Sequence, residues 1–220
     1  MSADGEAAAP ALRLWNWELS ANCYKVRLML ALLGVPYEPV AVDFFPGREN
    51  LDDAFLAVNP LGELPVIEAE GMRLAGSNAI LAYLARRHDP GGTWLPVDDP
   101  VRLGATMHWL GIAEGLNGTA GAARLEASLG FDLDGEAARA GAHRLFRVME
   151  RHLWFAEARG EDWLVSGAAP TVADVACFPA VVLSEEGGVS REDYPASRRW
   201  SDRVKRLPGF AVMPGVFAVA

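Results

Sequence analysis

The spacing of apolar residues predicts a strand followed by a helix near the start of the chain. Large apolar residues alternate with other residues over positions 12–17, which is typical of a strand. The next apolar residues are separated by 3, 4 and 7 positions, which places them on one face of a helix that begins after Ser20. Gly34 and Pro36 end this helix. Its apolar stripe consists of Val26, Met29, Leu30 and Leu33.

Short strands and helices then alternate as far as residue 88. A turn of Asn, Pro, Leu and Gly fills positions 59–62, and a Glu-Gly pair at 70–71 separates two apolar runs. Ser77 begins a further amphipathic helix. The predicted element order is β-α-β-α-β-β-α. Between the first and last helices, the elements are a strand at 37–42, a short helix at 52–58 and strands at 64–68 and 72–74.

The pattern changes at residues 89–100, which hold three prolines, two glycines and three acidic residues without periodicity. We interpret this stretch as a linker. The apolar spacing after it is helical, including a capping-box arrangement at 171–174, whereas 118–134 is rich in Gly and Ala and has no clear assignment. The predicted fold class is therefore α/β plus all-α. Its expected parts are a disordered tail (1–10), an α/β domain (11–88), the linker (89–100) and an all-helical domain (101–220).

Composition and charge limit the partners of such a protein. The 220 residues are 51% hydrophobic, and 29 acidic against 20 basic side chains give a formal net charge of −9. This balance argues against binding to nucleic acid or to anionic membranes, since both need a basic surface. No apolar run approaches the length of about 20 residues that spans a membrane. The first ten residues lack the pattern of a signal peptide, so we expect a cytoplasmic protein.

The cysteines and histidines give no sign of a metal site. Cys23 and Cys177 are the only cysteines and lie far apart in the sequence, so they form neither a disulfide framework nor a zinc pattern. The four histidines have no metal-ligand spacing. We predict no metal.

The helix that begins after Ser20 offers the first candidate for chemistry. A helix start presents unpaired N–H groups, which favour an anion such as a thiolate. Ser20 and Asn22 are placed to donate hydrogen bonds to that anion. Lowering a thiol pKa by about two units needs roughly 2.7 kcal/mol, which a hydroxyl donor and a helix end can supply together. The alternative is that Ser20 is only an N-cap.

Two further features point to a peptide-like, anionic ligand. Pro65 interrupts an apolar strand, and because proline removes a donor from the sheet, it belongs at an edge or in a cis bend. Such an exposed edge can pair with the backbone of a ligand. Gly76, Ser77 and Asn78 begin a helix that forms a second anion site. The alternatives are an edge strand without a ligand and a plain cap at Ser77.

The motifs around these residues resemble those of cytosolic glutathione transferases with a serine-type active site, over about residues 11–215. The resemblance implies a thioredoxin-like N-terminal domain, an all-helical C-terminal domain, glutathione as co-substrate and a homodimer. The motifs are Ser-Ala-Asn-Cys-Tyr-Lys-Val-Arg-Leu at 20–28, Asn-Pro-Leu-Gly-Glu-Leu-Pro-Val at 59–66, Ser-Asn-Ala-Ile-Leu-Ala-Tyr-Leu at 77–84 and Thr-Val-Ala-Asp at 171–174.

The resemblance assigns roles to individual residues. Ser20 would stabilise the glutathione thiolate, with help from Asn22. The backbone of Leu64, before a cis Pro65, would bind the cysteinyl part. Ser77 would hold the γ-glutamyl carboxylate at its helix start.

Two positions in the same motifs depart from the family pattern. Gly76 stands where the family usually has an acid or Gln that holds the γ-glutamyl ammonium. Glu63 stands where many members have Gln or Lys. These departures keep open a scaffold or binding protein that binds glutathione weakly or not at all and has no catalytic activity.

A second pocket would hold a small hydrophobic electrophile. The candidates for its wall are Trp17, Trp109, Leu116 and the stretch around Arg124, a cation expected to have few neighbouring partners. The electrophile itself is not encoded in the pattern.

Thiol–disulfide chemistry through Cys23 is a further alternative. Positions 20–23 resemble a Cys-x-x-Cys motif whose attacking cysteine is replaced by serine, so a structural thiol is the favoured interpretation. We expect Lys25 and Arg27, on the same helix, to lie on a solvated face.

Overall fold

The computed structural model describes residues 12–218, and its first part is a four-stranded sheet with the order β2-β1-β3-β4. β1 pairs in parallel with β2 and antiparallel with β3, and β3 pairs antiparallel with β4. The predicted element order up to residue 88 is confirmed. The expected tail at 1–10 lies outside the described residues. The strands are β1 (Leu12–Asn16), β2 (Glu38–Ala41), β3 (Val66–Ala69) and β4 (Met72–Ala75).

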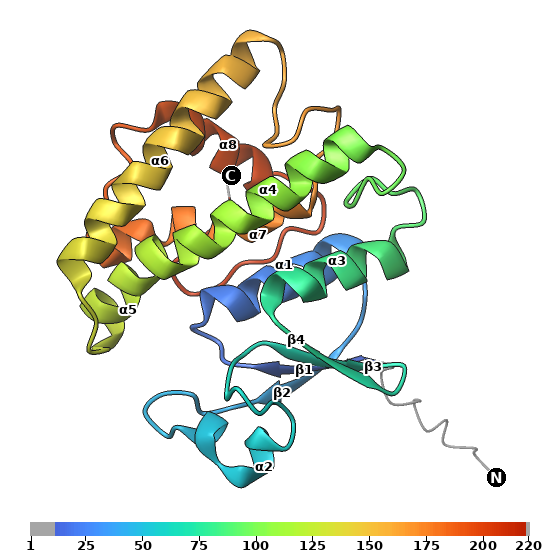
Figure 1. The fold of residues 1–220 in the computed structure, drawn as a ribbon, viewed down its shortest axis with the longest axis vertical. Coiled ribbons are helices and arrows are strands. Elements are labelled where there is room, and N and C mark those ends of the chain that lie inside the picture. The colour runs from blue at the N-terminus through green and yellow to red at the C-terminus, as the bar shows by residue number, and fades with distance from the viewer. Residues whose placement is uncertain (1–11, 219–220) are drawn as a thin grey trace.

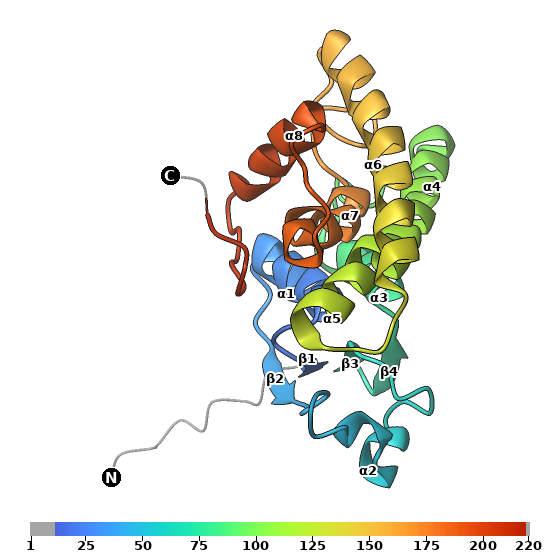
Figure 2. The same cartoon turned by 90° about the vertical axis from the view of Figure 1, so that its left-hand side faces the viewer.

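Helices cover both faces of this sheet (Figures 1 and 2). α1 (Ala21–Leu33) and α3 (Ser77–His88) pack side by side on one face, and the short α2 (Asp53–Leu56) lies on the other. The alternation of β1 explains the two layers, because neighbouring side chains point to opposite faces. Leu14 belongs to the large core, and Trp15 packs in a smaller cluster with Phe55.

Most of these helices begin and end at the residues that the sequence predicted. Ser20 is the N-cap of α1, and its hydroxyl oxygen accepts a hydrogen bond from the Cys23 N–H at 3.1 Å. Gly34 ends α1 in the left-handed conformation. At α3 the alternative of a Ser77 cap is wrong, because Gly76 is the N-cap residue and Ser77 is the first helical residue.

The remainder of the described chain is helical, as predicted. The stretch at 118–134, which the sequence left unassigned, continues α4 through one π-helical turn into α5. Close packing holds it in place, since a Cβ on Gly187 would lie 2.6 Å from the backbone nitrogen of Arg124. The elements are α4 (Pro100–Leu116), the π turn (Asn117–Gly121), α5 (Ala122–Leu129), α6 (Gly135–Ala158), α7 (Val172–Val182), a 3₁₀ turn (Ser184–Gly187) and α8 (Pro195–Lys205).

α7 is the central helix of the molecule. Every residue of α7 is buried, and it packs against α1, α3, α4 and α8. One continuous apolar core therefore joins the sheet-bearing part to the helical part. The division at 89–100 remains our proposal, supported by the position of all four strands before residue 76. Within residues 12–218, no helix is long and apolar enough to cross a membrane.

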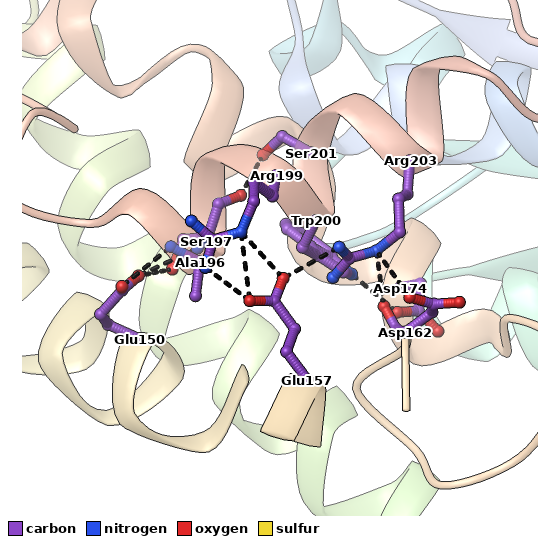
Figure 3. A network of polar contacts seen from close by, with 10 residues as sticks. All are labelled: Glu150, Glu157, Asp162, Asp174, Ala196, Ser197, Arg199, Trp200, Ser201 and Arg203. Atoms are coloured by element: carbon purple, nitrogen blue, oxygen red, sulfur yellow. Dashed lines mark hydrogen bonds and ion pairs between the residues drawn. The ribbon is translucent and has the colours of Figure 1, made fainter. Parts of the chain in front are cut away.

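A network of carboxylates fixes α8 against α6 and α7 (Figure 3). Glu150 accepts hydrogen bonds from the N–H groups of Ala196 and Ser197 at 2.9 Å each, so a side chain of α6 caps the start of α8. Glu157 pairs with Arg199 and Arg203 on the next turns of α8. The Glu150 contacts satisfy N–H groups at the start of α8 that no side chain of α8 itself caps.

Asp174 lies at one side of this network and is fully buried (Figure 3). Its carboxylate accepts hydrogen bonds from the Leu164 N–H at 3.0 Å, the Thr171 N–H at 2.9 Å and the Trp200 indole at 2.8 Å. The capping box predicted at 171–174 is confirmed, because the Thr171 hydroxyl in turn accepts from the Ala173 N–H. Asp174 therefore links the start of α7 to α8 and to the loop before α7.

Replacing Asp174 with Ala should lower the free energy of unfolding by about 3–5 kcal/mol, because three buried donors lose their charged acceptor. Denaturant-induced unfolding measures this change. Asp202→Ala removes a carboxylate from the exposed side of α8, and we expect it to change stability by less than about 0.5 kcal/mol. Equal effects of the two substitutions would contradict this role for Asp174.

Candidate functional site

A cavity of about 430 Å³ opens where the turn between β1 and α1, the start of α3, the loop after β2 and the α4–α5 region meet. The structure brings most of the predicted site residues together around it. Those in its wall are Trp17, Ser20, Asn22, Glu63, Leu64, Gly76, Ser77 and Arg124.

Two helix starts face this cavity. In α1 the first helical hydrogen bond is donated by the Tyr24 N–H to the Ser20 carbonyl, so the earlier N–H groups of Ala21 and Asn22 have no partner within the helix. In α3 the first such bond runs from the Ile80 N–H to the Gly76 carbonyl. The N–H groups before Ile80 are unpaired within α3 for the same reason. The cavity therefore has two positions that attract negative charge.

The hydroxyl of Ser20 can serve as cap and donor at once. Its oxygen accepts the Cys23 N–H, while its own hydrogen can rotate toward the Cys23 thiol or toward a ligand in the cavity. Accepting one bond polarises the O–H group toward donating another. The cap interpretation and the thiolate interpretation of Ser20 are therefore compatible.

The two helix starts are linked by their side chains. The Ser77 hydroxyl donates a hydrogen bond to the Asn22 Oδ1 at 3.3 Å. This contact engages the amide oxygen of Asn22 and leaves its NH₂ group as the donor that it can offer a ligand. Ser77 is buried, so a ligand meets mainly its backbone N–H.

The buried side chains of Arg27 and Arg124 bind backbone carbonyl oxygens of the turn before Ser20. Arg27 donates to the Trp17 carbonyl at 3.4 Å and to the Glu18 carbonyl at 2.9 Å, and its guanidinium also contacts the Asn16 side chain. Arg124 donates to the Leu19 carbonyl at 2.8 Å. Three consecutive carbonyl oxygens are thus bound by guanidinium groups.

The same contacts correct two expectations from the sequence. Arg124 is not poor in partners, because its Nε lies 2.6 Å from Glu186 while its Nη1 binds the Leu19 carbonyl. Lys25 and Arg27 are buried and do not lie on a solvated face. The flanking apolar residues Val26 and Leu28 are the one local signal that this face of α1 is covered.

Comparison with known proteins decides the family. A model described as the N-terminal domain of glutathione S-transferase matches residues 10–86. A solved structure of a possible glutathione S-transferase from Rhodopseudomonas palustris is 33% identical, with a TM-score of 0.82 over 92% of this chain and 98% of that one. The chain belongs to the glutathione S-transferase family. Its fold is accordingly the thioredoxin-like domain followed by a helical domain.

More distant relatives extend the comparison. Maleylacetoacetate isomerase from Pseudomonas aeruginosa is 28% identical over 213 residues, covering 90% of this chain and 93% of the isomerase. A structure of Ure2p in complex with glutathione is 25% identical and has a TM-score of 0.78, over 93% of this chain and 98% of that one.

Leu64 and Pro65 lie just before β3, which is an inner strand of the glutathione S-transferase sheet, so the expectation of an edge strand is wrong and the alternative of a cis bend is right. The Leu64–Pro65 peptide bond is cis, as the resemblance implied. The β3 ladder begins at Val66, so the backbone N–H and C=O of Leu64 take no part in sheet pairing. Pro65 itself is buried and does not line the cavity.

Two residues predicted for the substrate wall lie elsewhere. Trp109 is buried, with its ring 4.8 Å from that of His152, and Leu116 lies in the apolar core. Neither lines the cavity. Apolar residues such as Trp109 and Leu116 are found equally in a pocket wall and in a core. The rotation of α4 about its axis decides which of the two they face.

The sequence reasoning missed an aromatic wall and an acid. Phe44 lines the cavity, stacks on Trp17 at 5.3 Å and lies 6.4 Å from Phe131 of the loop after α5. Glu114 of α4 also lines the cavity. Phe44 and Phe45, which follow the predicted strand at 37–42, were the sequence signal for the aromatic wall. No sequence signal pointed to Glu114.

Both cysteines are inert in this environment. Burial raises the pKa of Cys23, outweighing the hydrogen bonds of Ser20 and Trp17 that lower it. Burial also raises the pKa of Cys177 far above its usual range, and its thiol donates to the Trp109 carbonyl at 3.6 Å. A thiol held protonated and away from solvent is a poor nucleophile, which disfavours disulfide chemistry through Cys23. Metal binding has no support either, since no cluster of three His, Cys, Asp or Glu side chains within 12–218 could hold an ion.

Thiol counting with a chromogenic disulfide should find neither cysteine reactive in the native protein at pH 8, because both thiols are buried and protonated. Unfolding in denaturant should expose both of them. A native protein with one rapidly reacting thiol, lost on Cys23→Ser substitution, would contradict the structural assignment of Cys23.

Proposed function

We propose that this protein is an enzyme that binds glutathione in the cavity and activates its thiol at Ser20 for attack on a small hydrophobic electrophile. The observation that carries the proposal is the convergence of the Ser20 hydroxyl and the two helix starts on one cavity. Membership of the glutathione S-transferase family and the similarity to a glutathione-bound Ure2p structure support it.

Two parts of the tripeptide have a chemical counterpart in the wall. The unpaired backbone of Leu64 would pair with the cysteinyl residue, as an added strand does. The unpaired N–H groups at the start of α3, at Ser77, would take the γ-glutamyl carboxylate. With the γ-glutamyl end and the cysteinyl backbone fixed, the cysteine sulfur would lie toward the start of α1.

Activation is electrostatic and needs no base among the side chains. A free thiol with a pKa near 8.5 is only a few per cent ionised at pH 7. A hydrogen bond from the Ser20 hydroxyl, the N–H groups at the start of α1 and the Asn22 amide all favour the thiolate over the thiol. The thiol proton leaves to solvent, the thiolate forms a C–S bond, and the displaced group departs with its electron pair.

The rest of the cavity suits an uncharged, apolar second substrate. Trp17, Phe44 and Leu125 supply its apolar wall. Arg124 is the sole basic residue among the described residues that line the cavity, and it already pairs with Glu186. We infer that a small hydrophobic electrophile fits better than a dicarboxylate.

Glutathione-dependent isomerisation is the second candidate, suggested by the similarity to maleylacetoacetate isomerase. Its substrate carries carboxylates, which would lie near Glu63 and Glu114 and have no unpaired cation in the described wall. A scaffold protein without catalysis remains the other alternative, suggested by Gly76 and Glu63. We further propose a cytoplasmic homodimer, in keeping with the family resemblance.

Ser20→Ala should lower kcat with an aryl halide about 10- to 100-fold, because one charge-assisted hydrogen bond to the thiolate is lost. The dissociation constant for glutathione should change much less, since the γ-glutamyl end and the cysteinyl backbone keep their contacts. Steady-state kinetics and calorimetric titration measure the two quantities. Ser20→Thr keeps both hydroxyl and cap and should retain most activity. Equal kcat values for the Ala variant and the native enzyme would rule out the role of Ser20.

Phe44→Ala should raise KM for the aryl halide about tenfold, since an aromatic side chain leaves the wall, while KM for glutathione stays within twofold. Leu61→Ala serves as a control, because Leu61 is exposed and lies outside the cavity wall. An unchanged KM for the halide in the Phe44 variant would place the second substrate elsewhere.

A further inference from the structure

The cavity that attracts anions at two helix starts also carries two exposed carboxylates, Glu63 and Glu114. Its basic lining residue, Arg124, is paired with Glu186. A ligand with only negative groups would therefore be repelled at these two carboxylates. The charge pattern indicates a ligand that is anionic at two points and cationic at a third.

Glu114 stands directly beside the start of α3. Asn78, the second residue of α3, donates through Nδ2 to the Glu114 Oε1 at 2.8 Å and to the Leu110 carbonyl at 2.9 Å. No hydrogen bond to Oε2 of Glu114 is found among residues 12–218. One oxygen thus fixes the carboxylate, and the other is available to a donor in the cavity.

The buried amino group of Lys25 interacts with the charge of this carboxylate. The ammonium of Lys25, on α1, is buried and has no hydrogen-bond partner between residues 12 and 218. Burial lowers the pKa of Lys25, and the charge of Glu114 is the largest influence opposing that shift. Asn78 therefore fixes Glu114 beside the start of α3 by a hydrogen bond, whereas Lys25 acts on it through charge.

Position 76 is glycine and supplies no charge to this part of the site. Gly76 has a φ of 90°, a conformation in which any other side chain is strained. An acid for this part of the site must therefore come from another element. Of the two carboxylates in the wall, Glu63 lies next to Leu64 in the loop before β3, and Glu114 adjoins the helix that would bind an α-carboxylate.

We propose that Glu114 binds the α-ammonium of the γ-glutamyl end of the ligand, so that the site selects peptides with a free α-amino group. This inference rests on the proposed binding of glutathione. The α-ammonium and α-carboxylate share one carbon atom, so a carboxylate seated at the start of α3 brings the ammonium to the side chain bonded to Asn78. Glu114 is in this account a specificity-determining residue, carried by the helical part of the chain.

Calorimetric titration with glutathione and with its analogue lacking the α-amino group, glutaryl-cysteinyl-glycine, tests the assignment. The native protein should bind glutathione about 10- to 100-fold more tightly than the analogue. Glu114→Gln keeps the acceptor for Asn78 but loses the charge, and it should bind both ligands with similar affinity. The matched Glu63→Gln variant should retain the native preference.

The results separate this inference from the function on which it rests. A Glu114→Gln variant that keeps the full preference for glutathione would overturn the role of Glu114 and leave the proposed function intact. Loss of the preference in Glu63→Gln alone would assign the ammonium to Glu63 and also overturn it. A native protein that binds neither ligand at millimolar concentration would refute the proposed function itself. The analogue comparison within the native protein needs no substitution, so it stands even if a variant fails to fold.

Discussion

The orientation of the peptide groups around Ser20 is the constraint on which the rest of the site depends. α1 begins at the end of β1, so its first N–H groups must point out of the helix and into the cavity. The carbonyl oxygens of the preceding residues also need hydrogen-bond partners. Arg27 and Arg124 donate hydrogen bonds to them. Because Arg124 belongs to α5, the helical part of the chain helps to set the geometry of the turn that precedes Ser20.

This arrangement of N–H groups explains how a protein with a net charge of −9 can attract an anionic ligand. A protein with this charge repels an anionic tripeptide at long range, but salt screens that repulsion beyond about 10 Å. At short range the ligand meets oriented N–H dipoles at the starts of α1 and α3. In our proposal, Glu114 then discriminates between anions that carry an ammonium and anions that do not. Attraction in this site is local and directional, and it does not depend on the overall charge.

The sequence predicted those parts of the structure that local patterns determine. Neighbours in the chain determine the strand and helix order up to residue 88, the Ser20 cap and the capping box at Thr171. The cis bond before Pro65 was one of two possibilities from the local pattern, and the family resemblance selected it. Burial of Lys25 and Arg27, the pairing of Arg124 with Glu186 and the position of Trp109 depend on how distant helices pack. A polar residue on a helix has the same local signature whether solvent or another helix covers it. Glu114 was missed for that reason, since only the contact between α4 and α3 brings it to the site.

The central claim is that the convergent helix start and the Ser20 hydroxyl stabilise a bound thiolate. The most direct test is to titrate the thiol of glutathione bound to the native protein, following the ultraviolet absorbance of the thiolate against pH. We predict a pKa about one to two units below the value near 8.5 of a free thiol. A bound thiol that titrates at or above the free value would contradict the account.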